Sequence, residues 1–196
     1  MSGTLQRPRL TMPEAEARAW KAACAEAQVV LEYGSGGSTL VAAEAGCAVW
    51  SVESDRAWAE GMRDWFAAHP SQAPVTIHHA DIGPTRDWGH PADESAFRHW
   101  PDYALKVWEL PGFLHPDLVL IDGRFRLGCF LTIAYRITRP VTLLFDDYLP
   151  RRAYHQAEEI AAPIEMIGRM ARFEIEPVTL TPDRLRAYAK ALLQPV

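Results

Sequence analysis

Short apolar runs alternate along the chain with longer segments that carry helix start and stop signals. The runs predict strands and the segments between them predict helices. Strands are expected at residues 28–33, 48–53, 75–78, 117–121 and 141–145, and helices at residues 13–27, 38–45, 55–69 and 126–138. Strands that alternate with helices of this length imply right-handed crossovers and a parallel sheet covered on both faces. The predicted fold class is therefore α/β, with a doubly wound, mostly parallel sheet.

The chain after Pro150 carries weaker signals. A helix at residues 151–162, a strand at 172–176 and a final helix at 184–193 are expected there. At 196 residues and 22.0 kDa, with 48% hydrophobic residues, the chain has the size of one domain with a substantial core. We therefore expect a single domain over residues 1–196.

The formal net charge is -5, the isoelectric point is near 5.8, and no run of lysine or arginine stands out. Such a chain does not suit a nucleic acid backbone, so a small-molecule substrate is favoured.

No segment approaches the roughly 18 apolar residues of a membrane span, and residues 1–12 lack the apolar core of a signal peptide. Cys24, Cys47 and Cys129 show no C-x-x-C spacing, which argues against a zinc site and a secreted disulfide framework. A cytoplasmic protein is expected.

The most informative segment, residues 29–39, lies where the first predicted strand ends. Its apolar run stops at Glu32 and breaks into a glycine-rich turn that begins at Gly34. Because glycine has no Cβ to clash, such a turn lets the backbone come close to a ligand. A helix is expected to begin at about Ser38, with the hydroxyl of that residue as its cap. The segment therefore predicts a nucleotide-cofactor site.

The spacing of the glycines separates two families that use such a turn. The dinucleotide fingerprint has a third glycine where this chain has Thr39. Glu32 suits a cationic ligand better than a pyrophosphate, since a carboxylate meets an ammonium directly or through water. The pattern of Glu32, Gly34 and Gly36 followed by Ser38 and Thr39 resembles motif I of class I S-adenosylmethionine (SAM) dependent methyltransferases. An ordinary glycine turn after a buried strand is the alternative interpretation.

The resemblance implies further contacts with the cofactor. Glu53 ends the second strand about 20 positions after Gly34, where an acid accepts hydrogen bonds from both ribose hydroxyls in SAM and NAD enzymes alike. Asp81 matches the methyltransferase position that meets the adenine, together with the amide of Ile82; a plain turn before Gly83 is the alternative. The methionine part of SAM would be cradled by Glu32, Gly34, Ser35, Gly36 and Ser38.

Carboxylates also follow the fourth and fifth predicted strands. Asp122 comes directly after residues 117–121, and Asp146 and Asp147 come after residues 141–145. Neighbouring parallel strands end at the same edge of a sheet, and three carboxylate oxygens suit Mg²⁺. The arrangement resembles the metal-dependent macrocin and sugar O-methyltransferases. That resemblance implies a magnesium ion on Asp122, Asp146 and Asp147 that activates and aligns the acceptor hydroxyl.

The chain departs from that family just after Asp122. Members commonly carry an acid or a histidine there, whereas this chain has Arg124 and Arg126. Two arginines favour an anionic substrate group such as a carboxylate or phosphate, which a guanidinium binds bidentately. Alternatively, the arginines neutralise the aspartates and no metal binds. The residues alone leave both interpretations open.

A long insert at residues 83–115 separates the third and fourth strands by far more than short loops and one helix. It contains Trp88, Trp100 and Trp108, and His90 and His99 are candidate bases from their place alone. An aromatic lid over the cofactor end of the sheet is expected. The alternative is that the tryptophans are buried against the sheet.

Together these features favour a small SAM-dependent methyltransferase that acts on an oxygen of a small metabolite. Asp122 and Arg124 would lie beside the transferred methyl group as the catalytic residues. A non-catalytic protein that holds SAM or S-adenosylhomocysteine is the second hypothesis, because no base follows Asp122. An NAD-dependent oxidoreductase is the third, and Thr39 and Asp81 disfavour it.

Overall fold

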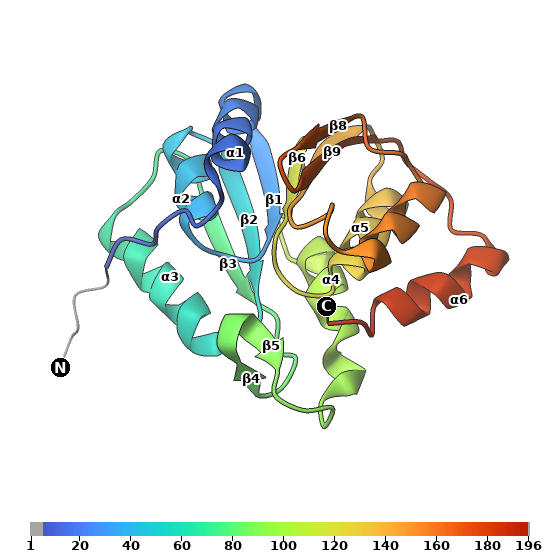
Figure 1. Ribbon diagram of the computed structural model, residues 1–196. Helices are drawn as coiled ribbons and strands as arrows, with labels where there is room; N and C mark the ends of the chain where they lie inside the picture. Colours follow the sequence, from blue (N-terminus) through green and yellow to red (C-terminus); the bar gives the residue numbers. More distant parts are fainter. Residues whose placement is uncertain (1–5, 196) are drawn as a thin grey trace.

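The computed structural model of the protein describes residues 6–195 and contains a seven-stranded sheet with the order β3-β2-β1-β6-β7-β9-β8 (Figure 1). The first five strands of that order are parallel, and β9 runs antiparallel to both of its neighbours. The strands are β1 (Val29–Tyr33), β2 (Ala48–Glu53), β3 (Val75–His79), β6 (Leu118–Ile121), β7 (Val141–Phe145), β8 (Glu165–Ile167) and β9 (Met170–Ile175). The predicted doubly wound α/β fold is confirmed.

Helices cover both faces of this sheet. Figure 1 shows α1, α2 and α3 on one side and α4, α5 and α6 on the other. Their bounds are α1 (Glu14–Glu26), α2 (Gly37–Glu44), α3 (Arg56–Ala68), α4 (Pro101–Leu105), α5 (Arg126–Arg136) and α6 (Pro182–Ala191). Within residues 6–195, no helix is long and apolar enough to cross a membrane.

Local sequence signals account for several helix ends. The Asp55 carboxylate accepts a hydrogen bond from the backbone N–H of Trp58 at 2.7 Å and so caps α3. Pro13 precedes α1 and Pro182 opens α6, at positions where a helix needs no N–H from proline. Gly46, with a φ of +89°, follows α2 and stops it. These helices therefore begin and end within a few residues of their predicted bounds.

The C-terminal part differs from the prediction in two places. Arg152–Glu159 forms a 3-10 helix, η4, where an α-helix over residues 151–162 was expected. The strand expected at residues 172–176 is β9, and a further strand, β8, pairs with it at the edge of the sheet. β8 is short and mostly exposed, so it has no apolar run by which the sequence could reveal it.

The central strands are buried on both faces, which explains their continuous apolar sequences. The core between the sheet and α5 includes Leu31, Val119, Phe130, Phe145 and Phe173. On the other face Trp20 of α1 packs with Val30, Leu120 and Leu144. The indole N–H of Trp20 donates to the Ser38 carbonyl at 3.1 Å, which ties α1 to the start of α2.

The insert between β3 and β6 lies at the carboxyl ends of the strands. It contains a hairpin of β4 (Thr85–Arg86) and β5 (His90–Pro91), helix α4 and the 3-10 turns η1 (Asp87–Gly89), η2 (Phe97–His99) and η3 (Lys106–Glu109). The Ser54 hydroxyl donates to the Gly89 carbonyl at 2.8 Å, which ties the hairpin to the end of β2. Trp100 is buried and Trp108 is partly buried, whereas Trp88 is 81% exposed. The insert thus contributes to the core and also presents an aromatic side chain; its role as a lid stays a prediction.

Candidate functional site

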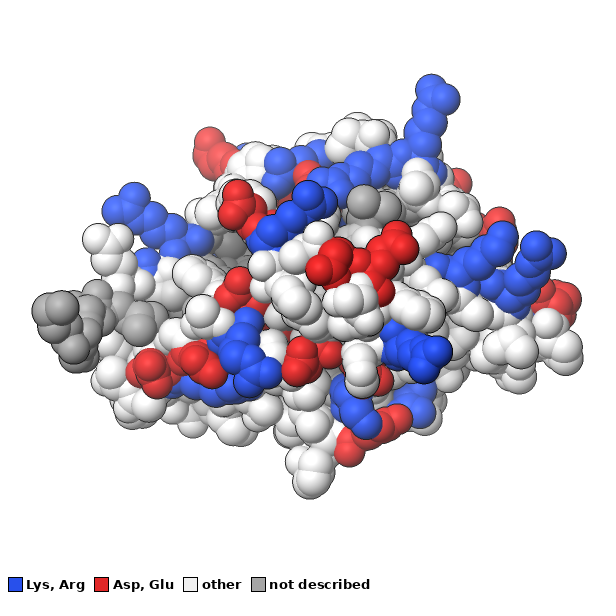
Figure 2. Space-filling view, turned by 90° about the horizontal axis from the view of Figure 1, so that it is seen from below, with Lys and Arg blue, Asp and Glu red and all other residues white. Residues whose placement is uncertain are grey.

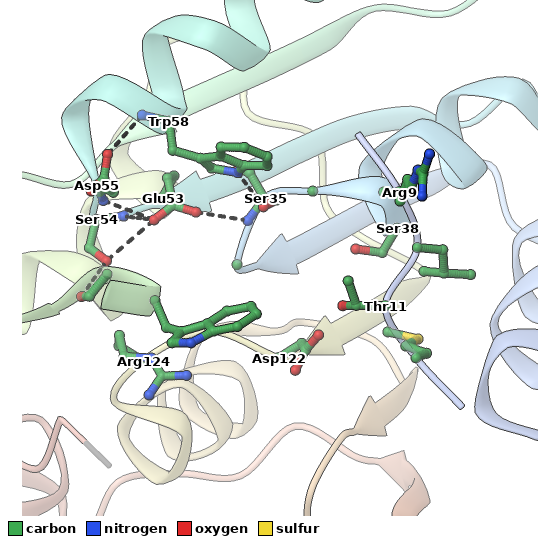
Figure 3. Close-up of a pocket in the computed structure, with 18 of the residues that line it drawn as sticks. Arg9, Thr11, Ser35, Ser38, Glu53, Ser54, Asp55, Trp58, Asp122 and Arg124 are labelled. Atoms are coloured by element: carbon green, nitrogen blue, oxygen red, sulfur yellow. Dashed lines mark hydrogen bonds between the residues drawn. The ribbon is translucent and has the colours of Figure 1, made fainter. Parts of the chain in front are cut away.

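A cavity of about 740 Å³ opens at the carboxyl ends of β1, β2 and β6 (Figure 3). Crevices at this place are where doubly wound sheets bind ligands. The lining consists of residues 9–12, 34–38, 53–55, 122–124, Ala57, Trp58, Trp88, Gly89 and Tyr103. Among the residues singled out in the sequence, the cavity brings together Gly34, Ser35, Gly36, Ser38, Glu53, Asp122 and Arg124.

Glycines shape one side of this cavity. Gly34 has a φ of +106°, and a Cβ placed on it would lie 2.8 Å from the Cα of Gly123. A Cβ on Gly123 would in turn lie 2.0 Å from the hydroxyl of Tyr103. Gly36 is different, because its backbone is extended and no atom of the described chain lies within 4 Å of a Cβ built there. Protein packing requires glycine at 34 and 123, whereas at 36 the open space is available to a ligand.

Glu32 is completely buried under the glycine turn and lies outside the cavity lining. Its carboxylate accepts hydrogen bonds from the hydroxyls of Ser38, Thr39 and Ser51. Burial raises the pKa of Glu32 to about 7, and the three donors only partly oppose this. Because the Ser38 hydroxyl donates to Glu32, it does not cap α2, and the predicted cap is wrong. The Thr39 hydroxyl accepts a hydrogen bond from the backbone N–H of Gly36 at 2.9 Å instead. Glu32 fastens the turn to α2 from within the protein, and a contact with the cofactor ammonium stays a prediction.

Glu53 ends β2 with its carboxylate at the cavity (Figure 3). One oxygen, Oε1, accepts hydrogen bonds from the N–H groups of Ser54 at 2.7 Å and Asp55 at 2.8 Å. The other oxygen, Oε2, accepts one longer bond of 3.3 Å from the N–H of Ser35. Burial raises the pKa of Glu53, and the backbone donors partly offset this rise. Oε2 therefore keeps acceptor capacity for ligand hydroxyl groups.

Two exposed tryptophans also line the cavity. Trp58 is 46% exposed, and its indole N–H donates to the Ser35 carbonyl at 2.8 Å, which holds the ring beside the glycine turn (Figure 3). Trp88 has a φ of +63°, which is unfavourable for a bulky residue. The sequence points to Trp88, which lies in the long insert, but not to Trp58, which lies within an ordinary amphipathic helix.

Asp81 and Ile82, expected at the adenine, lie outside the cavity lining. Asp81 is exposed, with one oxygen 3.2 Å from the Arg56 guanidinium and the other accepting the Gly83 N–H at 3.1 Å. This is the turn-forming role that was the alternative for Asp81. Ile82 is buried in the main core. A role for either residue in adenine binding stays a prediction.

The three aspartates expected to bind magnesium lie close together, but arginines hold them. Arg126 lies 3.1 Å from Asp122 and 3.6 Å from Asp147. Arg169 lies 3.0 Å from Asp146 and 2.9 Å from Asp147. Over the part of the chain that the structure describes, no group of three or more His, Cys, Asp or Glu side chains is arranged to hold a metal ion. Guanidinium groups supply the counter-charge that a cation would supply, which is the salt-bridge alternative; a magnesium ion on these aspartates stays a prediction.

Asp122 and Arg124, the expected catalytic residues, both line the cavity (Figure 3). Burial raises the pKa of Asp122; Arg126 opposes this rise, and the neighbouring Asp146 adds to it. The guanidinium of Arg126 also donates to the carbonyl oxygens of Asp122 at 2.7 Å and Gly123 at 2.9 Å. Arg126 thereby fixes the backbone of the loop that presents Asp122.

The segment of residues 9–12 completes the cavity on the side of α2 (Figure 3). A Cβ on Gly37 would lie 2.1 Å from the backbone N of Leu10, so this segment crosses directly over the start of α2. Met12 is buried in the core, which anchors the segment. The sequence gives no signal for this contribution, because a short segment before the first helix carries no periodic pattern.

Comparisons with known proteins show which solved structures share this fold. The chain is 56% identical to a methyltransferase-like protein from Silicibacter pomeroyi, over 96% of this chain and 99% of that one, with a TM-score of 0.93. The O-methyltransferase TomG from Streptomyces achromogenes in complex with SAM is 16% identical, over 87% of this chain and 82% of that one, with a TM-score of 0.56. An O-methyltransferase from Bacillus cereus in complex with S-adenosylhomocysteine is 13% identical, over 84% and 82%, with a TM-score of 0.59. No family model and no curated protein matches the chain.

The two O-methyltransferases share the fold with this chain, and the Silicibacter protein shares both fold and sequence. The chain belongs to one family with that methyltransferase-like protein.

Proposed function

We propose that this protein binds SAM in the cavity and transfers its methyl group to an oxygen of a small molecule. The observation that carries this proposal is that the glycine turn, Glu53 and Asp122 line one cavity at the carboxyl ends of β1, β2 and β6. Family membership favours this cofactor over NAD.

Different parts of the cavity lining suit the ribose, the methionine part and the purine base of SAM. Oε2 of Glu53 has acceptor capacity for the ribose hydroxyls. The open space beside Gly36 admits the methionine part close to the backbone. Trp58 and Trp88 offer aromatic faces on which a purine base stacks. These contacts leave the methyl group on the side of Asp122.

Methyl transfer then requires an acceptor oxygen in line with the sulfonium. The oxygen–carbon bond forms as the carbon–sulfur bond breaks, and the electron pair of that bond stays on sulfur to give S-adenosylhomocysteine. A hydroxyl acceptor must also lose its proton. The Asp122 carboxylate can take it, because burial brings its pKa nearer to that of a neutral-pH base.

The surface favours a small acceptor over a nucleic acid. Figure 2 shows the face at the bottom of Figure 1, and on it acidic and basic side chains are interspersed. The formal net charge of -5 points the same way, since a phosphate backbone needs a cationic surface.

The test compares the wild type with Asp122→Asn in an assay for release of S-adenosylhomocysteine from SAM, over a panel of hydroxylated compounds. The variant should bind SAM normally and turn over about 10²–10⁴-fold more slowly, which is the usual contribution of a general base. Equal turnover would remove Asp122 from the mechanism. A wild type that binds SAM tightly but never releases product would support the non-catalytic alternative, which the pairing of Asp122 with Arg126 favours.

A further inference from the structure

Arg124 follows Asp122 on the loop after β6, and its side chain is buried at the edge of the cavity (Figure 3). The residue is 7% exposed. Its Nη1 lies within hydrogen-bond distance of Nε2 of His90, on strand β5 of the insert. Its backbone N–H donates to the Tyr103 hydroxyl at 3.2 Å. Both contacts come from the insert, one to the side chain of Arg124 and one to its backbone.

The charges around Arg124 do not neutralise it. Arg126, Arg151 and Arg169 pair with the three aspartates of the salt-bridge network, Asp122, Asp146 and Asp147. No carboxylate within residues 6–195 forms an ion pair with Arg124. A buried guanidinium without a counter-charge is unfavourable. The cavity beside it is the place from which a ligand can supply that charge.

The partner of Arg124 is a neutral group. Burial and the nearby arginines, Arg124 first among them, lower the pKa of His90. A neutral imidazole accepts a hydrogen bond at Nε2 and carries its proton on Nδ1. His90 therefore orients the guanidinium without compensating its charge.

One edge of the guanidinium has no protein acceptor. Nε of Arg124 is buried and has no hydrogen-bond partner, and Nη2 donates to no residue in the described part of the chain. Nε and Nη2 form the side of an arginine that binds a carboxylate or phosphate with two parallel hydrogen bonds. An unsatisfied buried donor is costly unless an acceptor completes it.

We propose that Arg124, oriented by His90, binds an oxyanion group of the methyl acceptor, so that the substrate is a hydroxylated carboxylic acid or phosphate ester. This inference rests on the proposed function. Because Arg124 and Asp122 lie on one loop, an acceptor held by its anionic group would present its hydroxyl near Asp122. The carboxylate of SAM itself is expected at the glycine turn, which follows β1, whereas Arg124 follows β6.

The first test uses thermal unfolding of the protein saturated with S-adenosylhomocysteine, with inorganic phosphate or acetate added at constant ionic strength. Either anion should raise the melting temperature of the wild type by mass action. Arg124→Gln should abolish this rise, and Arg98→Gln, which removes an exposed arginine elsewhere on the insert, should keep it. Because Arg124→Gln also removes an uncompensated buried charge, its melting temperature without anion should equal or exceed that of the wild type. An equal rise in wild type and Arg124→Gln, or no rise in the wild type with either anion, would overturn the proposal.

A second arm separates the acceptor from the cofactor as the source of the anion. S-adenosylhomocysteine carries a carboxylate and 5′-methylthioadenosine does not. Arg124→Gln should leave the affinity for both compounds unchanged, whereas a selective loss of at least about tenfold for S-adenosylhomocysteine would assign Arg124 to the cofactor. If the wild type binds neither compound, the proposed function fails, and the anion titration of the free protein still tests Arg124.

His90 is a positioning residue in this proposal. His90→Gln keeps an acceptor for Nη1 and should retain the stabilisation by phosphate, while His90→Leu should lose it. Equal behaviour of the two variants would remove His90 from the proposal.

Discussion

Gly34 and Gly123 approach each other so closely that neither position can carry a side chain. The two residues follow β1 and β6, which are neighbours in the sheet, and a Cβ on Gly34 would lie 2.8 Å from both the Cα and the N of Gly123. This contact brings the glycine turn against the loop of Asp122. It is the structural reason that the cofactor turn and the expected catalytic residue share one cavity.

Gly34→Ala should lower the free energy of unfolding by more than about 2 kcal/mol, because it combines a strained positive φ with a backbone clash. Gly46→Ala is the matched control, since Gly46 has a φ of +89° but no atom within 4 Å of a Cβ. Urea unfolding of both variants isolates the clash as the difference between them. Equal losses would show that Gly34 is required for its backbone angle alone.

Gly36→Ala should leave the free energy of unfolding within about 0.5 kcal/mol of the wild type, since the backbone there is extended and the space is open. The same change should weaken binding of S-adenosylhomocysteine at least tenfold if the ligand occupies that space, as calorimetric titration would measure. An unchanged affinity would place the ligand elsewhere.

Trp88→Gly should leave stability nearly unchanged, because relief of about 1–2 kcal/mol of left-handed strain offsets the greater freedom of glycine in the unfolded chain. It should cost about 1–3 kcal/mol of binding free energy for S-adenosylhomocysteine, the usual worth of stacking on a base. Trp88→Phe keeps a ring and should retain most of the affinity. Titration of the two variants checks this, and a full loss in Trp88→Phe would point to the indole N–H instead of stacking.

Glu32 should make stability depend on pH. Its pKa is about 7 in the fold against 4.5 for an ordinary glutamate, so the fold favours the protonated form. The resulting stability is present at low pH and is lost as the pH rises from 4.5 towards 7. The advantage of the wild type over Glu32→Gln should therefore shrink by about 2 kcal/mol between about pH 5 and about pH 8. Denaturant unfolding at the two pH values measures this, and a constant difference would mean that the hydroxyl donors keep Glu32 ionised throughout.

The sequence predicted the fold well because the parallel strands are buried on both faces and therefore appear as apolar runs. It did not predict β8, whose side chains are largely exposed, or the 3-10 form of Arg152–Glu159. The hydrophobic pattern identifies the strands and helices that pack into the core, whereas elements at the edge of the sheet depend on contacts with their neighbours.

The candidate site was predictable where residues sit directly at strand ends, as Gly34, Glu53 and Asp122 do. The sequence could not show that the Glu32 carboxylate points into the protein. Its position at a strand end does not give the direction of the side chain, and the three hydroxyl groups that donate to it come together only in the fold. It also could not show that Arg169 reaches Asp146 and Asp147, since Arg169 lies in the turn between β8 and β9, far along the chain.

Calorimetric titration with S-adenosylhomocysteine of the wild type and of Glu53→Gln tests the account most directly. The wild type should bind with micromolar affinity, and a chelator of divalent ions should leave this affinity unchanged, because arginines hold the aspartates. Glu53→Gln should weaken binding by about 1.5–3 kcal/mol through loss of a charged acceptor. Absence of binding to the wild type, or equal affinity in the variant, would contradict the assignment of this cavity to SAM with Glu53 at the ribose.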